Sequence, residues 1–295
     1  MGLAVASVHM ATQNQSETFD LDGETTVNRL GFGAMRLTGE DIIGPPSDED
    51  EARRVAQRAV ELDVDFVDTA DSYGPGVSER ILGEALDCTR DDLVVATKGG
   101  LLRNRDGDWL PHGDPDYLRN AVLCSLDRLR VDSIDLYQYH RPDPDTPFED
   151  SVHALAELKD DGVIEHVGVS NVSVEQLETA LDIVDVATVQ NRFNVGYREE
   201  ADVLAACEDH GVGFIPWYPL GAAELDDDVA AAVDDVADAH DASRMQVAIA
   251  WLLGHSDVTL PIPGTSSVAH LEENVAASAL ELTDDEMATL DAVGE

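Results

Sequence analysis

Lysine is almost absent from this sequence: only Lys98 and Lys159 occur, beside sixteen arginines. Basic residues total 18 against 61 aspartates and glutamates, which gives a formal net charge of −43 at pH 7. Such a polyanion is repelled by phosphate backbones, so nucleic-acid binding is excluded. The acidic residues are spread along the whole chain, which favours adaptation to concentrated salt, with a binder of basic partners as the alternative.

Long apolar runs and cysteine clusters are also missing. No run of 18 apolar residues occurs, so we expect no membrane-spanning helix. The chain opens without basic residues, which argues against a signal peptide, and residues 1–16 are expected to be a poorly ordered extension. Cys88, Cys124 and Cys207 match no zinc or disulfide pattern, so we expect buried reduced thiols, no metal site and a cytoplasmic location.

A short apolar run followed by an amphipathic segment recurs along the chain and indicates alternating strands and helices. Strands are expected at 29–37, 64–70, 92–98, 134–140, 166–171, 186–190, 213–220 and 259–264. Helices are expected near 48–62, 77–87, 114–130, 148–161, 173–184, 198–210, 227–253 and 267–277. Eight such units predict an α/β protein with a parallel sheet closed into a (β/α)8 TIM barrel.

Two further segments complete the predicted fold. Residues 19–27 contain Asp22-Gly23, a hairpin turn signal, and are expected to form an N-terminal β-hairpin across the bottom of the barrel. A C-terminal extra helix near 283–293 is expected to pack outside it. No linker rich in proline, glycine or serine interrupts the pattern, so residues 17–295 are predicted to form one domain.

Polar residues end several of the expected strands, at the face where TIM barrels place their active sites. They are Asp68, Lys98, His140, Asn171 and Gln190. Each alone is more often a cap, a surface group or a satisfied polar side chain. Their consistent position, together with a lysine in a chain that nearly lacks lysine, favours a functional site.

The residues Asp68, Tyr73, Lys98 and His140 are suited to reducing the carbonyl of a small substrate. A tyrosine keeps its proton at neutral pH because its ordinary pKa is about 10. A neighbouring lysine cation stabilises the phenolate and lowers that pKa, and a carboxylate holds the lysine charged. A histidine donates a hydrogen bond that orients the carbonyl oxygen.

This order and spacing resemble the Asp-Tyr-Lys-His tetrad of the aldo-keto reductases, and residues 65–86 are similar to that family's signature. The resemblance runs from about residue 18 to 293. It implies NAD(P)-dependent reduction of an aldehyde or ketone, with Tyr73 as general acid. NADPH is the expected cofactor and NADH the alternative, because Gly264 and His270 stand where better-known members carry basic residues for the 2′-phosphate.

The same resemblance implies the cofactor contacts. Ser170, Asn171 and Gln190 correspond to the residues that hold the nicotinamide carboxamide, which offers both a donor and an acceptor. Trp217 corresponds to an aromatic that stacks on the nicotinamide ring, with a core tryptophan as the alternative. The expected pyrophosphate and adenosine contacts, some just before a helix start that suits a phosphate, are Pro219, Leu220, Gly221, Gly264, Thr265, Ser266, Ser267, His270, Glu273 and Asn274.

Other functions remain open at this point. A Schiff-base barrel aldolase would use Lys98 but would leave Tyr73 and Asp68 unexplained. A cofactor-sensing regulatory subunit with the aldo-keto reductase fold would keep the whole tetrad. A Rossmann site is excluded, because GFGAMR (31–36) has Arg36 where the third glycine belongs.

Substrate choice is expected to depend on loops. The segment 99–112 after Lys98 carries Trp109, which is expected to line the substrate pocket, with an exposed ring on a flexible loop as the alternative. Residues 28–46, 107–111 and 262–274 resemble a bacterial subgroup related to pyridoxal reductases, so pyridoxal is a candidate substrate. The expected assembly is a monomer or small homo-oligomer.

Salt should stabilise this chain strongly. Molar KCl shortens the Debye length to roughly 3 Å and screens the repulsion among the surface carboxylates. We expect the melting temperature to rise steeply between about 0.1 M and about 2 M KCl, while the pH profile of kcat moves little. Equal melting temperatures at the two concentrations would contradict the halophilic interpretation.

Overall fold

The computed structural model describes residues 18–219, 221 and 225–293. The predicted extension over residues 1–16 and the predicted cofactor residue Leu220 lie outside this part of the chain. Among the described residues, no helix has both the length and the apolar character needed to cross a membrane.

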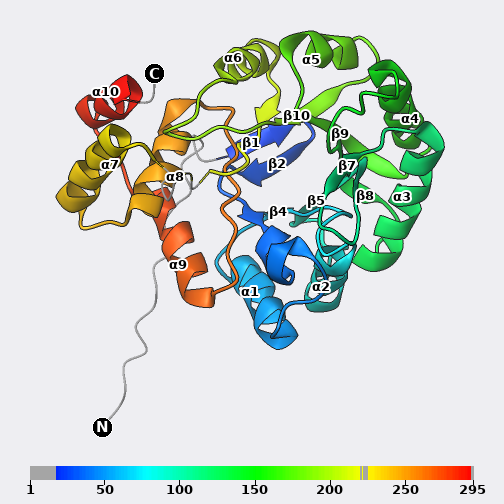
Figure 1. The fold of residues 1–295 in the computed structure, drawn as a ribbon, viewed down its shortest axis with the longest axis horizontal. Helices are drawn as coiled ribbons and strands as arrows, with labels where there is room; N and C mark the ends of the chain where they lie inside the picture. Colours follow the sequence, from blue (N-terminus) through cyan, green and yellow to red (C-terminus); the bar gives the residue numbers. More distant parts are fainter. Residues whose placement is uncertain (1–17, 220, 222–224, 294–295) are drawn as a thin grey trace.

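A parallel sheet of seven strands forms the centre of the molecule, with the helices around it (Figure 1). Its order is β11-β10-β9-β8-β5-β4-β3. The strands are β3 (Phe32–Gly33), β4 (Phe66–Asp68), β5 (Val94–Gly99), β8 (Ile134–Tyr139), β9 (Ile164–Ser170), β10 (Val186–Gln190) and β11 (Gly213–Phe214). Neighbours in this order are consecutive along the chain, apart from the inserted pair β6–β7, as a barrel of strand–helix units requires.

The expected eighth strand, 259–264, closes the barrel without forming a regular ladder. Parallel bridges join Thr259 to Phe214 on one side and Gly264 to Gly33 on the other. The carbonyl oxygens of Pro261 and Pro263 accept hydrogen bonds from the backbone N–H groups of Gly31 and Gly33. Because proline has no N–H, this segment cannot donate at those positions and is not a continuous strand.

Two other strands are shorter than predicted. Of the segment 29–37, only β3 is extended, and Ala34–Leu37 forms a 3-10 helix. Of the described residues 213–219, only β11 forms a regular strand, although Trp217 makes a further parallel bridge with Arg192. The chain leaves the barrel wall early at both places, and both segments then line the cavity described below.

The helices agree with the predicted units, and the helical segments expected near 227–253 are two separate helices. They are α1 (Glu49–Glu61), α2 (Val77–Ala85), α3 (Pro115–Leu129), α4 (Phe148–Asp160), α5 (Val174–Leu181), α6 (Ala201–His210), α7 (Asp227–His240), α8 (Arg244–His255), α9 (Val268–Ala276) and α10 (Asp284–Val293). Short 3-10 helices cover Glu40–Ile42 and Ala277–Ala279. Side-chain caps explain several starts: Asp48 and Asp114 accept backbone N–H groups of α1 and α3, and Ser173 and Ser243 begin capping boxes of α5 and α8.

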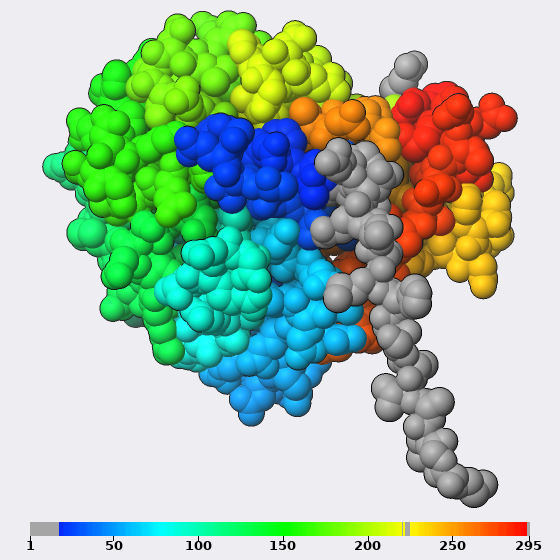
Figure 2. Space-filling model, turned by 180° about the vertical axis from the view of Figure 1, so that it is seen from behind, coloured from blue at the N-terminus to red at the C-terminus, as the bar shows by residue number. Residues whose placement is uncertain are grey.

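The N-terminal hairpin closes the bottom of the barrel, as predicted. Strands β1 (Thr18–Leu21) and β2 (Thr25–Asn28) pair antiparallel, and Figure 2 shows them as the dark blue patch in the middle of the back face. Leu21 and Val27 pack into one buried cluster with residues from inside the barrel. At the turn, Asp22 contacts Lys159 Nζ at 3.3 Å and His166 Nδ1 at 3.0 Å, which ties the hairpin to the barrel wall.

The segment 99–112 is more ordered than the predicted loop. It contains a second antiparallel pair, β6 (Leu101–Arg103) and β7 (Trp109–Pro111). The Arg103 guanidinium lies 3.6 Å from the ring centroid of Trp109 and donates hydrogen bonds to the carbonyl oxygens of Asp41, Ile42 and Gly107. Trp109 is therefore partly buried in an ordered strand pair at the cavity, and is not an exposed ring.

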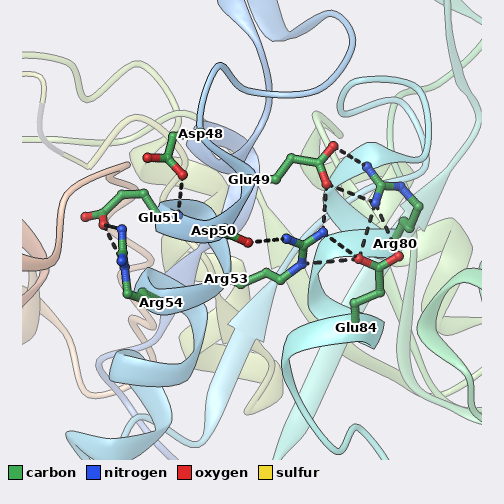
Figure 3. Close-up of polar contacts among 8 residues, drawn as sticks. All are labelled: Asp48, Glu49, Asp50, Glu51, Arg53, Arg54, Arg80 and Glu84. Carbon is green, nitrogen blue, oxygen red and sulfur yellow. Dashed lines mark hydrogen bonds and ion pairs between the residues drawn. The ribbon is translucent and has the colours of Figure 1, made fainter.

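Surface arginines are shared among several carboxylates. Arg53 lies 2.8 Å from Glu49, 3.0 Å from Asp50 and 2.9 Å from Glu84, and Arg80 bridges Glu49 and Glu84 from the next helix (Figure 3). Each guanidinium offsets the repulsion among acids of α1 and α2. Networks of this kind contribute more than isolated exposed pairs.

Cys88 and Cys207 are buried as expected, and burial raises the pKa of each thiol to about 12. The prediction of buried thiols is wrong for Cys124, which is exposed on α3. Among the described residues, no three histidine, cysteine, aspartate or glutamate side chains lie together in a way that could hold a metal ion.

A half-buried acid, Asp71, contacts the backbone of β5 and a side chain of helix α3. Asp71 Oδ2 accepts a hydrogen bond from the Tyr117 hydroxyl at 3.2 Å, whereas its Oδ1 makes none with a described residue. Burial raises the pKa of Asp71 to about 7, with a further contribution from Glu79. The backbone N–H of Asp71 donates to the carbonyl of Lys98, which fixes the loop that leads to Tyr73.

Packing at the closing seam, where the segment 259–264 meets residues 31–33, leaves no room for a methyl group at Gly31. An added Cβ would lie 2.7 Å from both the carbonyl oxygen and a ring carbon of Phe66. Gly31→Ala should therefore lower the free energy of unfolding by about 1–3 kcal/mol in denaturant titrations. The control is Gly254→Ala in α8, where a Cβ meets only the flexible Met287 side chain. Equal losses in the two variants would contradict this account of the seam.

The raised pKa of Asp71 predicts a pH-dependent stability difference. The folded state binds the Asp71 proton more tightly than the unfolded chain, whose carboxyl titrates near pH ~4. This contribution is present at low pH and is lost as the pH rises through 7. The unfolding free energy of Asp71→Asn minus that of the parent chain should therefore be larger at pH 8 than at pH 5. Urea unfolding at the two pH values measures this difference. Asp106→Asn, an exposed control, should show no such difference, and the same pattern in both variants would refute the prediction.

Candidate active site

A buried ion pair lies at the carboxyl ends of strands β4 and β5. Lys98 Nζ donates to Asp68 Oδ2 at 2.6 Å and to the Thr69 carbonyl oxygen at 2.7 Å. The second oxygen of Asp68 accepts from the side-chain amides of Gln138 at 3.0 Å and Gln190 at 2.9 Å. Four strands thus contribute to one network, in which the carboxylate is fully engaged.

Tyr73 reaches this ion pair from the loop after β4. Its ring centroid lies 5.2 Å from Lys98 Nζ, and its ring is nearly perpendicular to those of His140 and Trp109, with centroids 5.8 Å and 6.4 Å away. Burial raises the pKa of Tyr73, and the Lys98 cation opposes this rise without reversing it. The expected net lowering is therefore wrong in direction, because the cost of burying a phenolate exceeds the attraction of the cation.

Lys98 stays charged in this buried position. Burial lowers its pKa, but Asp68 and Tyr73 raise it by more, so the net direction is upward. His140 is the opposite case: burial, followed by the charges of Lys98 and Arg141, lowers its pKa well below the ordinary value. The imidazole is therefore neutral at pH 7, and its Nδ1 lies 3.3 Å from the Ser72 hydroxyl.

A cavity of about 510 Å³ opens over this network. Nine of the predicted site residues line it: Asp68, Tyr73, His140, Ser170, Asn171, Gln190, Trp217, Pro219 and Gly264. Lys98 lies directly behind them with no exposed surface. The structure thus brings the predicted tetrad and the predicted carboxamide-binding residues to one cavity.

The amide groups of Asn171 and Gln190 have their donors engaged within the protein. Asn171 donates to the His140 carbonyl at 3.0 Å and to Ser170 Oγ at 2.9 Å, and its Oδ1 accepts from Trp217 Nε1 at 3.1 Å. Gln190 donates to Asp68, and its Oε1 accepts no hydrogen bond from a described residue. The side-chain atoms at this wall that can still form hydrogen bonds are therefore mainly acceptors. Trp217 is half-buried at the cavity and is not a core residue.

The remaining predicted cofactor residues that the structure describes do not line this cavity. They are Gly221, Thr265, Ser266, Ser267, His270, Glu273 and Asn274. Ser266 lines a second hollow beside Arg36, which borders both spaces. Thr265 Oγ1 accepts the backbone N–H of Ser267 at 3.1 Å, whereas the hydroxyls of Ser266 and Ser267 make no hydrogen bond with a described residue.

The sequence analysis missed several groups at this site. Gln138 points into the barrel with Leu136 and His140, so a polar residue at alternate spacing before a strand-end histidine was the available signal. Ser72 lies next to Tyr73 but gave no signal of its own. Tyr218 and Arg141 line the cavity beside residues that were predicted.

Known proteins resemble this chain over nearly its whole length. The model of the aldo/keto reductase family matches residues 29–295. An oxidoreductase of Schizosaccharomyces pombe is 46% identical over 92% of this chain and 89% of its own length. Pyridoxine 4-dehydrogenase of Escherichia coli is 40% identical over 94% of this chain and 98% of its own length.

Solved structures agree with these sequence matches. An aldo-keto reductase from Klebsiella pneumoniae in complex with NADPH is 26% identical and superimposes with a TM-score of 0.81, covering 94% of this chain and 95% of that chain. The barrel, the buried ion pair and the cavity above it thus occur in a chain that matches this family from the first barrel strand onward. The chain belongs to the aldo/keto reductase family.

Proposed function

We propose that this chain reduces an aldehyde or ketone to an alcohol with NADPH, using Tyr73 as the proton donor. The observation that carries the proposal is the position of the Tyr73 side chain, on the cavity wall and 5.2 Å from the buried Lys98 cation. A raised pKa keeps the phenol protonated at neutral pH, as a general acid requires.

The cavity suits a nicotinamide cofactor. A carboxamide N–H₂ group finds acceptors in Gln190 Oε1 and Asn171 Oδ1, and the half-buried faces of Trp217 and Tyr218 offer flat apolar contacts. When bound, the cofactor supplies the hydride. The complex of the Klebsiella pneumoniae enzyme with NADPH supports the same choice for this chain.

The far end of the cavity supports NADPH over NADH. Arg36 borders both the main cavity and the hollow at Ser266, which Glu40 and Asp41 also line, and it makes no ion pair with a described residue. The unengaged hydroxyls of Ser266 and Ser267 lie before the first turn of α9, where phosphate groups are favoured. Arg36 thus offers the 2′-phosphate a cation in place of the basic residue that is missing at Gly264.

The chain's own groups handle the proton. Tyr73 donates its hydroxyl proton to the carbonyl oxygen as that oxygen becomes an alcohol, and Lys98 stabilises the phenolate left behind. Asp68 keeps Lys98 charged and oriented. We assign Ser72 as the donor to His140 Nδ1, which leaves the Nε2 hydrogen of the neutral imidazole to bind the carbonyl oxygen.

The geometry disfavours the aldolase alternative. A Schiff-base lysine attacks as a free amine, whereas Lys98 is fully buried, ion-paired and held in its charged form. A regulatory subunit would retain the same groups. Turnover with any carbonyl compound distinguishes the enzyme from such a sensor.

A carbonyl panel tests the proposal directly. Aldehydes and ketones, including pyridoxal, are incubated with NADPH or NADH at high KCl, and loss of nicotinamide absorbance is followed. Pyridoxal is included because the Escherichia coli relative is a pyridoxine 4-dehydrogenase. We propose concentrated salt and the cytoplasm as the working environment on the basis of the acidic composition and the unpaired cysteines.

Removing the Tyr73 hydroxyl should abolish most of the turnover. Tyr73→Phe keeps the ring and its contacts but loses the proton, so kcat should fall about 10²–10⁴-fold while the Kd for NADPH changes little. Tyr197→Phe is the matched control, because its hydroxyl bonds only the exposed Glu199. Retention of more than about half of the activity by Tyr73→Phe would refute its role as proton donor.

A further inference from the structure

Nearly all arginines in this acidic chain have partners. They lie against carboxylates, carbonyl oxygens or aromatic rings, as in the network of Figure 3. In the described part of the chain, the exceptions with no hydrogen bond, ion pair or ring contact are Arg36, Arg105 and Arg141. Arg105 is exposed at the turn between β6 and β7, whereas Arg36 and Arg141 line the central cavity.

The cavity is therefore cationic within a strongly anionic protein. Among the residues that the structure describes, the only acid that lines it is Asp68, which is already bound by Lys98, Gln138 and Gln190. No described carboxylate compensates Arg141, which is half-buried. A guanidinium in this position presents several N–H donors that match a carboxylate or phosphate.

The two arginines serve different ends of the cavity. Arg36 borders the hollow at Ser266, on the side of the proposed phosphate contacts. Arg141 follows His140 directly at the end of β8, and its charge contributes to keeping that imidazole neutral. The ring of His140 lies 5.8 Å from that of Tyr73, so Arg141 belongs to the reacting end of the cavity.

We infer that the substrate carries an anionic oxygen group, a carboxylate or a phosphate, which binds Arg141 while its carbonyl lies between Tyr73 and His140. The inference rests on the proposed function and specifies its substrate class. A net charge of −43 repels anions at a distance, so a local cation with no protein partner is needed to hold one. Neutral carbonyl compounds of the same shape lack this contact.

Matched substrate pairs test the inference. Benzaldehyde is compared with 4-carboxybenzaldehyde, and pyridoxal with pyridoxal 5′-phosphate, with NADPH and at the lowest KCl concentration that keeps the chain folded. The parent chain should have a kcat/KM roughly 10- to 100-fold higher for the anionic member of at least one pair. The pair with the larger preference identifies a carboxylate or a phosphate as the recognised group.

Arg141 variants assign the preference to this residue. Arg141→Gln should remove most of the preference, mainly through KM, and Arg141→Lys should restore part of it. Arg105→Gln makes the same change of charge at an exposed position and should retain the full preference. Thermal melting of each variant confirms folding before the kinetic comparison.

Three results would overturn the inference. Equal kcat/KM values within both pairs would show that no anion is recognised, while reduction of the neutral aldehydes would leave the proposed function intact. An Arg141→Gln variant that raises the KM for NADPH, or that affects both members of a pair equally, would assign Arg141 to the cofactor or to His140. Failure of the parent chain to reduce any of the four compounds would refute the proposed function and the inference with it.

Discussion

The buried contact between Lys98 and Asp68 is the constraint on which the site depends. Two charges taken out of water are tolerated only when each is paired and the remaining polar atoms are satisfied. Gln138, Gln190 and the Thr69 carbonyl meet that requirement here. The network therefore fixes the ends of four strands relative to one another and gives the tyrosine above it a charged neighbour.

Burial changes what the same residues do. The phenol of Tyr73 and the imidazole of His140 both remain uncharged at neutral pH. For Tyr73, the cost of burying the phenolate exceeds the attraction of Lys98. For His140, burial and the charges of Lys98 and Arg141 all disfavour the imidazolium. Lys98 remains charged because its carboxylate partner lies at hydrogen-bond distance. One cation beside two neutral donors is an arrangement suited to giving up a proton to a carbonyl oxygen.

The sequence predicted the barrel units and the hairpin because period and turn signals are local properties, and strand ends together with the family resemblance predicted which four side chains meet at the cavity; their catalytic roles stay predictions. It did not predict contacts that depend on which strands become neighbours, such as that of Gln138 with Asp68. The interrupted closing strand follows from Pro261 and Pro263, which lack donors on the side where the ladder would continue. The direction of the Tyr73 pKa was mispredicted because the extent of burial was unknown. Roles in cofactor binding, including that of Leu220, stay predictions.

Scarcity of lysine also has a chemical consequence. Lys98 is fully buried, and Lys159 on α4 lies partly covered against Asp22. Reagents that acylate or cross-link side-chain amines therefore meet almost no reactive surface on the described part of the chain. The exposed thiol of Cys124 on α3, with both other cysteines buried, is the natural point for attaching a label or a solid support without disturbing the barrel.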